Sequence, residues 1–162
     1  MEHNIFDEIE RKIKNAGLTI FSKDHNRPWG GFFVIDEDQA QLFANVFLNG
    51  LDVSNIKISG KLSPKILLVK PHTRLSWQYH HRRAELWRVI EGKVGIVRSE
   101  TDEEKELQTL NTFDEVTLKQ GERHRLVGLE DWAIIAEIWQ HTDPNNPSNE
   151  EDIVRVQDDY GR

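Results

Sequence analysis

Apolar residues near the N-terminus recur at helical spacing. Ile5, Phe6, Ile9 and Ile13 fall three or four positions apart, and Gly17 follows where a C-terminal cap is expected. The pattern predicts one short amphipathic helix over residues 4–16. Its apolar side must be buried, so we expect the helix to cover an end or a side of the remaining fold.

Beyond this helix the pattern changes to short runs typical of β-strands, separated by turn residues. The predicted runs are 31–35, 41–47, 66–70, 74–79, 85–91, 93–99, 113–118, 124–127 and 132–140. Many short strands with turns between them indicate an all-β sandwich or barrel. We therefore expect a helical extension over residues 1–25, a barrel over 26–140 and a C-terminal tail over 141–162 that packs on the barrel.

Composition and charge narrow the possible functions. The chain has 162 residues, no cysteine and a formal net charge of −7. Disulfides, thiolate metal sites and a cysteine nucleophile are thereby excluded, and an acidic chain is poorly suited to bind nucleic acid. The sequence shows neither a secretory leader nor a membrane-length apolar run, so we expect a cytoplasmic protein with no membrane partner.

Metal-ligand residues gather in one stretch and recur once later. Gln78 and His80 are two residues apart, so on a strand they share a face. Glu85 opens the next predicted strand, and His124 opens a later one after Gly121. If these strands are neighbours, Gln78, His80, Glu85 and His124 converge on one point. Imidazole, carboxylate and amide groups together suit one divalent ion: zinc, with manganese, cobalt, iron or nickel as alternatives.

Taken singly, each of these residues has an ordinary structural interpretation. A histidine on a strand is usually packed or exposed, and we interpret His3, His25 and His141 in that way. The prediction of a metal site depends on the combination of Q-x-H-x4-E with a later G-x-x-H. His81 should point away from His80, toward the outside.

Several motifs occur in a fixed order along residues 27–162. They are R-P-W-G at 27–30, K-I-L-L-V-K-P at 65–71, L-S-W-Q-Y-H-H-R-R-A-E-L-W at 75–87, G-E-R-H-R-L at 121–126 and E-E-D-I-V-R-V-Q-D-D-Y-G-R at 150–162. The series resembles the cupin domain of type II phosphomannose isomerases, the isomerase half of bifunctional mannose-1-phosphate guanylyltransferase/mannose-6-phosphate isomerase proteins. His72 replaces a glycine of the family pattern, and Lys119 replaces a proline.

The resemblance implies a single cupin jelly-roll barrel that acts as a metal-dependent aldose–ketose isomerase. The implied substrate is a sugar phosphate, most simply mannose 6-phosphate converted to fructose 6-phosphate. No nucleotidyltransferase domain or glycine-rich nucleotide loop is present in the sequence, so we expect the isomerase half alone. Exposed strands of a small barrel often pair across a two-fold axis, and we expect a homodimer.

The reaction moves a proton between adjacent carbons, so a base must reach a carbon-bound hydrogen. Alternation along 132–140 turns Glu137 inward, and Glu137 is the candidate base, although a carboxylate paired with an arginine explains it equally well. Lys65 and Lys70 are alternative bases.

Arg155 is the candidate phosphate ligand by resemblance, and it could instead lie on a tail that only packs. The other available arginines are Arg27, Arg82, Arg83, Arg125 and Arg162.

Two other functions remain open from the sequence. One is a sugar-binding or regulatory cupin that does not catalyse a reaction. The other is a cupin oxygenase, which would use iron and usually carries a histidine where this chain has Gln78.

Overall fold

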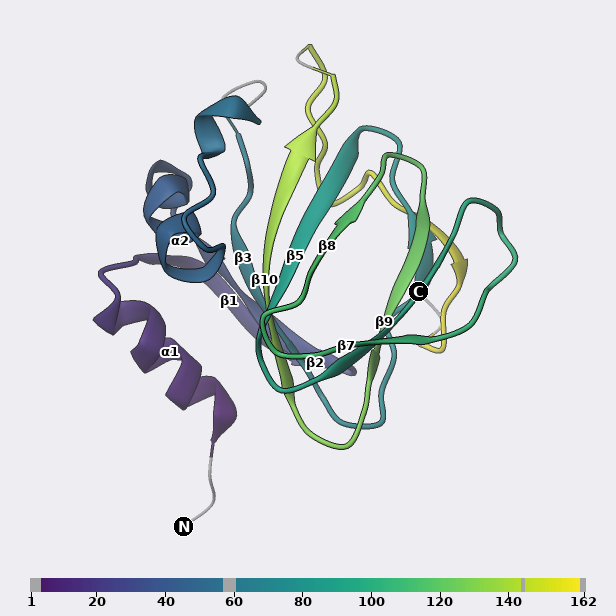
Figure 1. Ribbon diagram of the computed structural model, residues 1–162, viewed down its shortest axis with the longest axis horizontal. Coiled ribbons are helices and arrows are strands. Elements are labelled where there is room, and N and C mark those ends of the chain that lie inside the picture. The colour runs from purple at the N-terminus through teal and green to yellow at the C-terminus, as the bar shows by residue number, and fades with distance from the viewer. Residues whose placement is uncertain (1–3, 57–60, 144, 161–162) are drawn as a thin grey trace.

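A computed structural model describes residues 4–56, 61–143 and 145–160. Two antiparallel sheets form its body, with two α-helices and two short 3-10 helices near the N-terminus (Figure 1). The elements are α1 (Ile5–Asn15), β1 (Ile20–Arg27), β2 (Gly30–Ile35), η1 (Glu37–Gln39), α2 (Ala40–Phe47), η2 (Val53–Asn55), β3 (Lys65–Val69), β4 (Trp77–Tyr79), β5 (Arg83–Glu91), β6 (Val94–Ser99), β7 (Gln108–Leu110), β8 (Glu115–Leu118), β9 (Arg123–Gly128), β10 (Ala133–His141) and β11 (Val154–Gln157).

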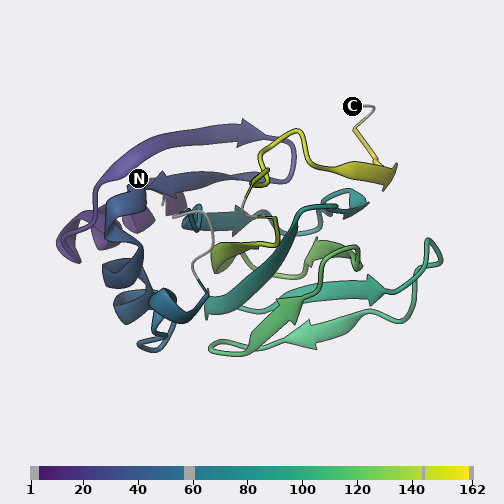
Figure 2. The ribbon, with the colours of Figure 1, turned by 90° about the horizontal axis from the view of Figure 1, so that it is seen from above.

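The predicted all-β barrel is confirmed, and it consists of two sheets. One sheet has the order β1-β2-β3-β10-β5-β8, and the other has the order β11-β4-β9-β6-β7. The two sheets face each other, and the helices cover the outside of the first sheet (Figures 1 and 2). The first sheet is therefore buried on both faces, which is why β3 and β10 consist largely of apolar residues.

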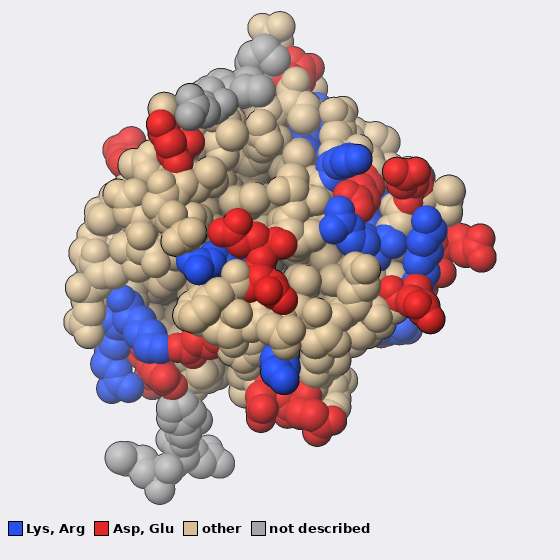
Figure 3. Space-filling model, in the orientation of Figure 1, with Lys and Arg blue, Asp and Glu red and all other residues tan. Residues whose placement is uncertain are grey.

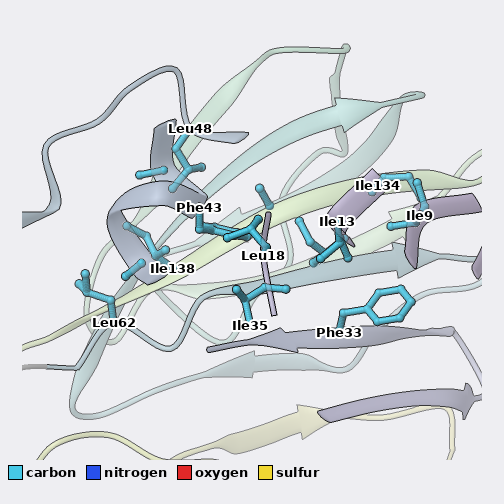
Figure 4. Packing of buried hydrophobic residues seen from close by; sticks show 14 of the residues in the cluster. Ile9, Ile13, Leu18, Phe33, Ile35, Phe43, Leu48, Leu62, Ile134 and Ile138 are labelled. Carbon is cyan, nitrogen blue, oxygen red and sulfur yellow. The ribbon is translucent and has the colours of Figure 1, made fainter. Parts of the chain in front are cut away.

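Alternation along β3 and β10 divides the buried residues into two cores. Ile66 and Leu68 on β3 belong to the core that includes residues of both α-helices. Figure 4 shows other members of this core, among them Ile9, Ile13, Phe43 and Ile134. Leu67 and Val69 point the other way, into the barrel between the sheets. The same alternation on β10 turns Ile135, Glu137 and Trp139 inward.

The predicted N-terminal helix is α1. Asn4 caps its N-terminus, because the Asn4 side chain accepts hydrogen bonds from the backbone N–H groups of Phe6 and Asp7. Ile9 and Ile13 are buried against the first sheet, as the spacing predicted.

The prediction of a strand over 41–47 was wrong, because this segment is helix α2. Ala40, Phe43, Ala44 and Phe47 recur at i, i+3, i+4 and i+7, so one helical face packs on the sheet. The predicted segment starts at Gln41 and so leaves out Ala40, the first residue of this helical series.

Three further strands were not predicted. β1 pairs with β2 in antiparallel register, so the first sheet begins at Ile20, inside the segment expected to be a helical extension. β7 pairs with β6, and β11 pairs with β4. The predicted strand over 74–79 is regular only at its end, as β4, with an isolated bridge at Arg74.

The surface carries charges of both signs. Acidic and basic side chains lie close together over the face shown in Figure 3, without a large area of a single sign. Among the described residues, no helix has the length and apolar character that a membrane crossing requires.

Candidate metal centre

Three strands bring His80, Glu85 and His124 together inside the barrel. β4 pairs with β9 so that Gln78 lies directly opposite His124. His80 follows β4, and after a short turn Glu85 faces inward from β5. One ligand atom from each of His80, Glu85 and His124 lies within 4.8 Å of the other two. The three side chains are only 2–3% exposed.

Both histidines present Nε2 to this centre. Nδ1 of His80 lies 2.7 Å from the backbone oxygen of Asp152, and Nδ1 of His124 lies 3.0 Å from that of Glu122. A carbonyl oxygen only accepts, so each Nδ1 carries a hydrogen, and in a neutral imidazole Nε2 then keeps its lone pair. Burial lowers the pKa of His124 to about 4, which keeps this imidazole neutral.

Glu85 supplies the carboxylate between the two imidazoles. Its Oε1 lies 3.1 Å from Nε2 of His80, and its Oε2 lies 3.7 Å from Nε2 of His124. Burial opposes ionisation of Glu85, but the neighbouring His80 and Arg83 outweigh burial and hold the pKa of this carboxyl well below its usual range. An ionised carboxylate is the form that binds a cation.

The residues present fit a metal ion. Nε2 of His124 is buried and has no hydrogen-bond partner among the described residues. A buried polar atom without a partner is costly unless a ligand satisfies it. Two imidazole nitrogens and a carboxylate are a donor set typical of zinc and related divalent ions, and three protein ligands leave positions open for substrate.

Gln78 lines the same cavity, but its amide oxygen accepts a hydrogen bond from the Ser76 hydroxyl. Its place opposite His124 agrees with the predicted convergence, and its role as a fourth ligand stays a prediction. His81 is exposed on the outside, as alternation predicted.

Arg83 is a neighbour whose role sequence reasoning did not identify. Its guanidinium is buried 3.5 Å from the centre of the Trp139 ring and donates to Glu85 Oε1 over 2.9 Å and to His80 Nε2 over 3.2 Å. An ion bound at His80 Nε2 would take the lone pair that Arg83 Nη2 faces, whereas Glu85 Oε1 has a second lone pair for Arg83. Arg83 has the same parity along β5 as Glu85, and this alternation could have placed it inside.

Glu137 lies inside the barrel, as predicted. Trp87 and Trp139 each donate an indole N–H to one of its carboxylate oxygens, over 2.8 Å and 2.9 Å. Burial and the nearby charge of Glu85 raise the pKa of Glu137 to about 7. The two indoles hold the carboxylate in one orientation, and its pKa lies near neutrality.

Lys65 lies beside Glu137 on the neighbouring strand, directly opposite it in the ladder. Its buried amine lies 4.4 Å from the centre of the Trp139 ring and forms an ion pair with Glu150 of the tail. Lys70 is exposed and does not line the cavity.

The tail folds back on the barrel and brings Arg155 to the cavity. Arg155 lies opposite Gln78 in the pairing of β11 with β4, and it lines the cavity with Glu137 and His124. Arg27 and Arg125 also line it, whereas Arg82 does not, and Arg162 lies outside the described residues. Arg125 is fully engaged with Leu75, Glu104 and Gln157.

The cavity is cationic although the chain is acidic. Five cationic residues line it against three carboxylates, namely Arg27, Lys65, Arg83, Arg125 and Arg155 against Glu85, Glu137 and Glu150. A local excess of positive charge favours an anionic ligand despite the overall charge of −7.

His25 and His141 have structural contacts outside the candidate centre. His25 stacks on Phe6 with ring centres 4.3 Å apart, and His141 is buried, accepting a hydrogen bond from the backbone N–H of Ser148. His3 lies outside the described residues. The interpretation of His25 and His141 as packed or exposed residues without a functional role agrees with these contacts.

Comparison with solved structures identifies the fold. Oxalate decarboxylase from Bacillus subtilis matches with a TM-score of 0.56 and 17% identity over 85% of this chain and 31% of that chain. Vicilin from Corylus avellana matches with a TM-score of 0.56 and 16% identity over 86% of this chain and 36% of that chain. At such identities the likeness shows the fold alone, which is that of the cupins.

Curated relatives are more similar in sequence to this chain than these two solved structures are. Xanthan biosynthesis protein XanB of Xanthomonas campestris pv. campestris is 28% identical over 158 residues, which is 96% of this chain and 27% of that protein. Alginate biosynthesis protein AlgA of Pseudomonas aeruginosa is 28% identical over 136 residues, 84% of this chain and 22% of that protein. The chain therefore spans about a quarter of the length of these relatives.

The family profile described as mannose-6-phosphate isomerase C-terminal matches residues 37–158. The match includes β3 to β11 and with them every residue of the candidate centre. With the cupin fold and the ordered motifs, it shows that this chain belongs to the family of mannose-6-phosphate isomerase C-terminal domains.

Proposed function

We propose that the protein is a metal-dependent aldose–ketose isomerase that converts mannose 6-phosphate to fructose 6-phosphate. The observation that supports this most directly is the buried triad of His80, Glu85 and His124, whose His124 Nε2 has no partner among the described residues. Family membership supports the isomerase class, and the cationic cavity supports a phosphorylated substrate.

The centre is proposed to hold zinc, with manganese, cobalt, iron or nickel as alternatives. His80, Glu85 and His124 would be its ligands, with Gln78 as a fourth. A divalent ion at this place would polarise the substrate carbonyl and stabilise negative charge on its oxygen.

Glu137 is proposed as the base. Its carboxylate would take the proton from C2 of the aldose, and the electron pair of that C–H bond would pass into a C1–C2 double bond as the carbonyl oxygen gains negative charge. Return of the proton to C1, with transfer of the hydroxyl proton from O2 to O1, completes the ketose. The two indole N–H groups fix the carboxylate, and a pKa near 7 suits both removal and return of a proton.

Arg155 is proposed to bind the phosphate from the mouth of the cavity. An arginine presents its donors in a planar fork that matches phosphate oxygens. Arg27 and Lys65 line the same cavity and would add positive charge.

A second candidate function is a sugar-phosphate-binding cupin without turnover. The observation that favours it is Arg83, whose guanidinium pairs with Glu85 and donates to His80 Nε2. In such a protein the arginine would stay in place and the centre would bind no ion.

The deciding experiment is an isomerase assay of the zinc-loaded protein with mannose 6-phosphate, before and after removal of metal by a chelator. We expect fructose 6-phosphate to form only in the loaded protein and activity to return when zinc is restored. Binding of mannose 6-phosphate without turnover, unaffected by zinc, would establish the second candidate. Oxygen consumption by iron-loaded protein would indicate an oxygenase instead.

A further inference from the structure

We infer that Asp152, in the C-terminal segment, is a positioning residue for the metal centre. Its carboxylate fastens the segment to the turn between β4 and β5, and its carbonyl thereby fixes the orientation and tautomer of His80. The inference deepens the proposed function and rests on it for the role of the centre. The hydrogen bond between Asp152 and His80 can nevertheless be measured in metal-free protein.

Both carboxylate oxygens of Asp152 are occupied. Oδ1 accepts from the backbone N–H of His81 over 2.9 Å, and Oδ2 accepts from that of Arg82 over 2.9 Å. The Ser148 hydroxyl donates to Oδ2 over 2.6 Å. The residue is 3% exposed. A carboxylate buried with three donors is held firmly, so the residue anchors the segment beside the ligand-bearing turn.

The backbone oxygen of the same residue meets the metal ligand. His80 Nδ1 donates to it over 2.7 Å. On the other side of the ring, Arg83 can only donate, and its Nη2 lies 3.2 Å from His80 Nε2. Glu85 Oε1, which only accepts, also lies 3.1 Å from Nε2. The Asp152 carbonyl places a hydrogen on Nδ1, and the neutral ring with that hydrogen is the tautomer that offers Nε2 to a metal.

A second connection joins the segment to β10 and to Arg83. The Ser148 hydroxyl accepts from Arg83 Nη1 over 3.1 Å while it donates to Asp152. The Ser148 N–H donates to Nδ1 of His141, which is buried at the end of β10. The tail therefore does more than pack against the barrel wall, because its hydrogen bonds end on a ligand and on the arginine beside it.

The two histidines of the centre differ in what holds them. His124 donates to the carbonyl of Glu122, two residues away in the turn that leads into β9. His80 donates to a carbonyl 72 residues away. A change at Asp152 should therefore disturb His80 and leave His124 in place, which gives the experiment an internal control.

The test compares metal-free wild type, Asp152→Asn and Glu151→Gln by NMR of the imidazole nitrogens at about pH 8, above the usual imidazole range. Glu151 is the exposed neighbour in the same segment and matches the change of charge. Asparagine keeps the size of Asp152, but its NH2 group cannot accept from a backbone N–H.

We expect His80 of the wild type and of Glu151→Gln to carry its hydrogen on Nδ1. In Asp152→Asn we expect a mixture of tautomers at His80, an unchanged His124 and a 10–100-fold loss of zinc affinity in chelator competition, on the order typical of groups that orient a metal ligand.

The inference is overturned if wild-type His80 carries its hydrogen on Nε2. It is equally overturned if Asp152→Asn leaves both the His80 tautomer and the zinc affinity unchanged, or disturbs both histidines alike. Should Asp152→Asn fail to fold, Ser148→Ala removes a single donor to the carboxylate and must shift the His80 signals in the same direction. Failure to bind zinc or to isomerise in the wild type would count against the proposed function, while the His80 tautomer would still decide this inference.

Discussion

Glu137 is a buried carboxylate whose pKa is shifted upward. Burial and the charge of Glu85 raise its pKa to about 7, although two indole N–H groups favour its ionised form. The folded protein therefore holds a proton on Glu137 over a range in which the unfolded chain, with an ordinary value of 4.5, has released it.

The sign of the resulting pH dependence follows from proton binding. Between about pH 5 and pH 8 the folded state binds more protons at this site, so the free energy of unfolding falls as pH rises, by about 2–3 kcal/mol from this group. In Glu137→Gln this contribution should be missing. Denaturant unfolding of both proteins across that range measures the difference, and parallel curves would contradict the raised pKa.

Catalytic activity, unlike the free energy of unfolding, should rise with pH. A base must be ionised, so kcat/KM, which reports the free enzyme, should rise with pH through about 7 and level off above it. Glu137→Gln should lower kcat by about 10²–10⁴-fold. Retention of near-normal kcat in this variant would remove Glu137 from its proposed role.

Residue-scale chemistry was only partly predictable. Alternation placed Gln78, His80, Glu85 and Glu137 on inward faces, because a strand has a period of two residues whatever its partners are. The hydrogen bonds of Arg83 to Ser148 and of Asp152 to the backbone N–H of His81 could not be predicted, because they join segments 65 and 71 residues apart.

At the scale of elements, close approach of strands explains a glycine that the sequence shows only as part of a motif. Gly30 begins β2 with φ at 133°, and a Cβ there would lie 2.0 Å from the backbone oxygen of Leu68 on β3. Only glycine allows the two strands to pair at this point.

Gly30→Ala should therefore lower the free energy of unfolding by at least about 2 kcal/mol, because backbone atoms must separate to admit the methyl group. Gly50→Ala is the matched control, since Gly50 also has a positive φ of 76° but has nothing within 4 Å of an added Cβ. That variant should cost about 1–2 kcal/mol from backbone strain alone. Equal losses in denaturant unfolding would show that contact with Leu68 is unimportant.

Strand β11 holds part of the C-terminal tail beside the cavity. Its pairing with β4 sets Arg155 opposite Gln78 at the cavity. A hydrogen-bonded charge on phosphate contributes about 1.5–3 kcal/mol. Arg155→Ala should therefore raise the KM for mannose 6-phosphate by about 10–100-fold with a smaller effect on kcat.

Arg155→Lys is the control for charge and should recover part of the affinity, because lysine keeps the charge and loses the fork. Steady-state kinetics with both variants would separate the two contributions. An unchanged KM in Arg155→Ala would mean that the tail does not bind the phosphate.

The whole molecule should be stabilised by its metal. Zinc that binds only the folded state at about 1,000 times its Kd adds about 4 kcal/mol. For a chain of this size that corresponds to a rise in Tm of about 8–16 °C. Thermal unfolding with and without zinc measures it.

His124→Ala should abolish the zinc-dependent shift, because it removes the unpartnered Nε2 from the centre. His81→Ala is the matched control, since His81 is exposed and outside the triad, and it should keep the full shift. A shift of the same size in both variants would place the zinc elsewhere.

Local pattern alone determined the short helix, most strands of the barrel and the inward side of the candidate ligands, because hydrophobic periodicity depends on near neighbours. It failed at α2, where aromatic residues common in strands form one face of a helix packed on the sheet. Tertiary structure alone decided that His80, Glu85 and His124 meet, and that Arg83, Lys65 and the tail surround them. The physical reason is that the pairing of distant strands depends on the whole buried core, so the distances between such residues are fixed only when the chain has folded.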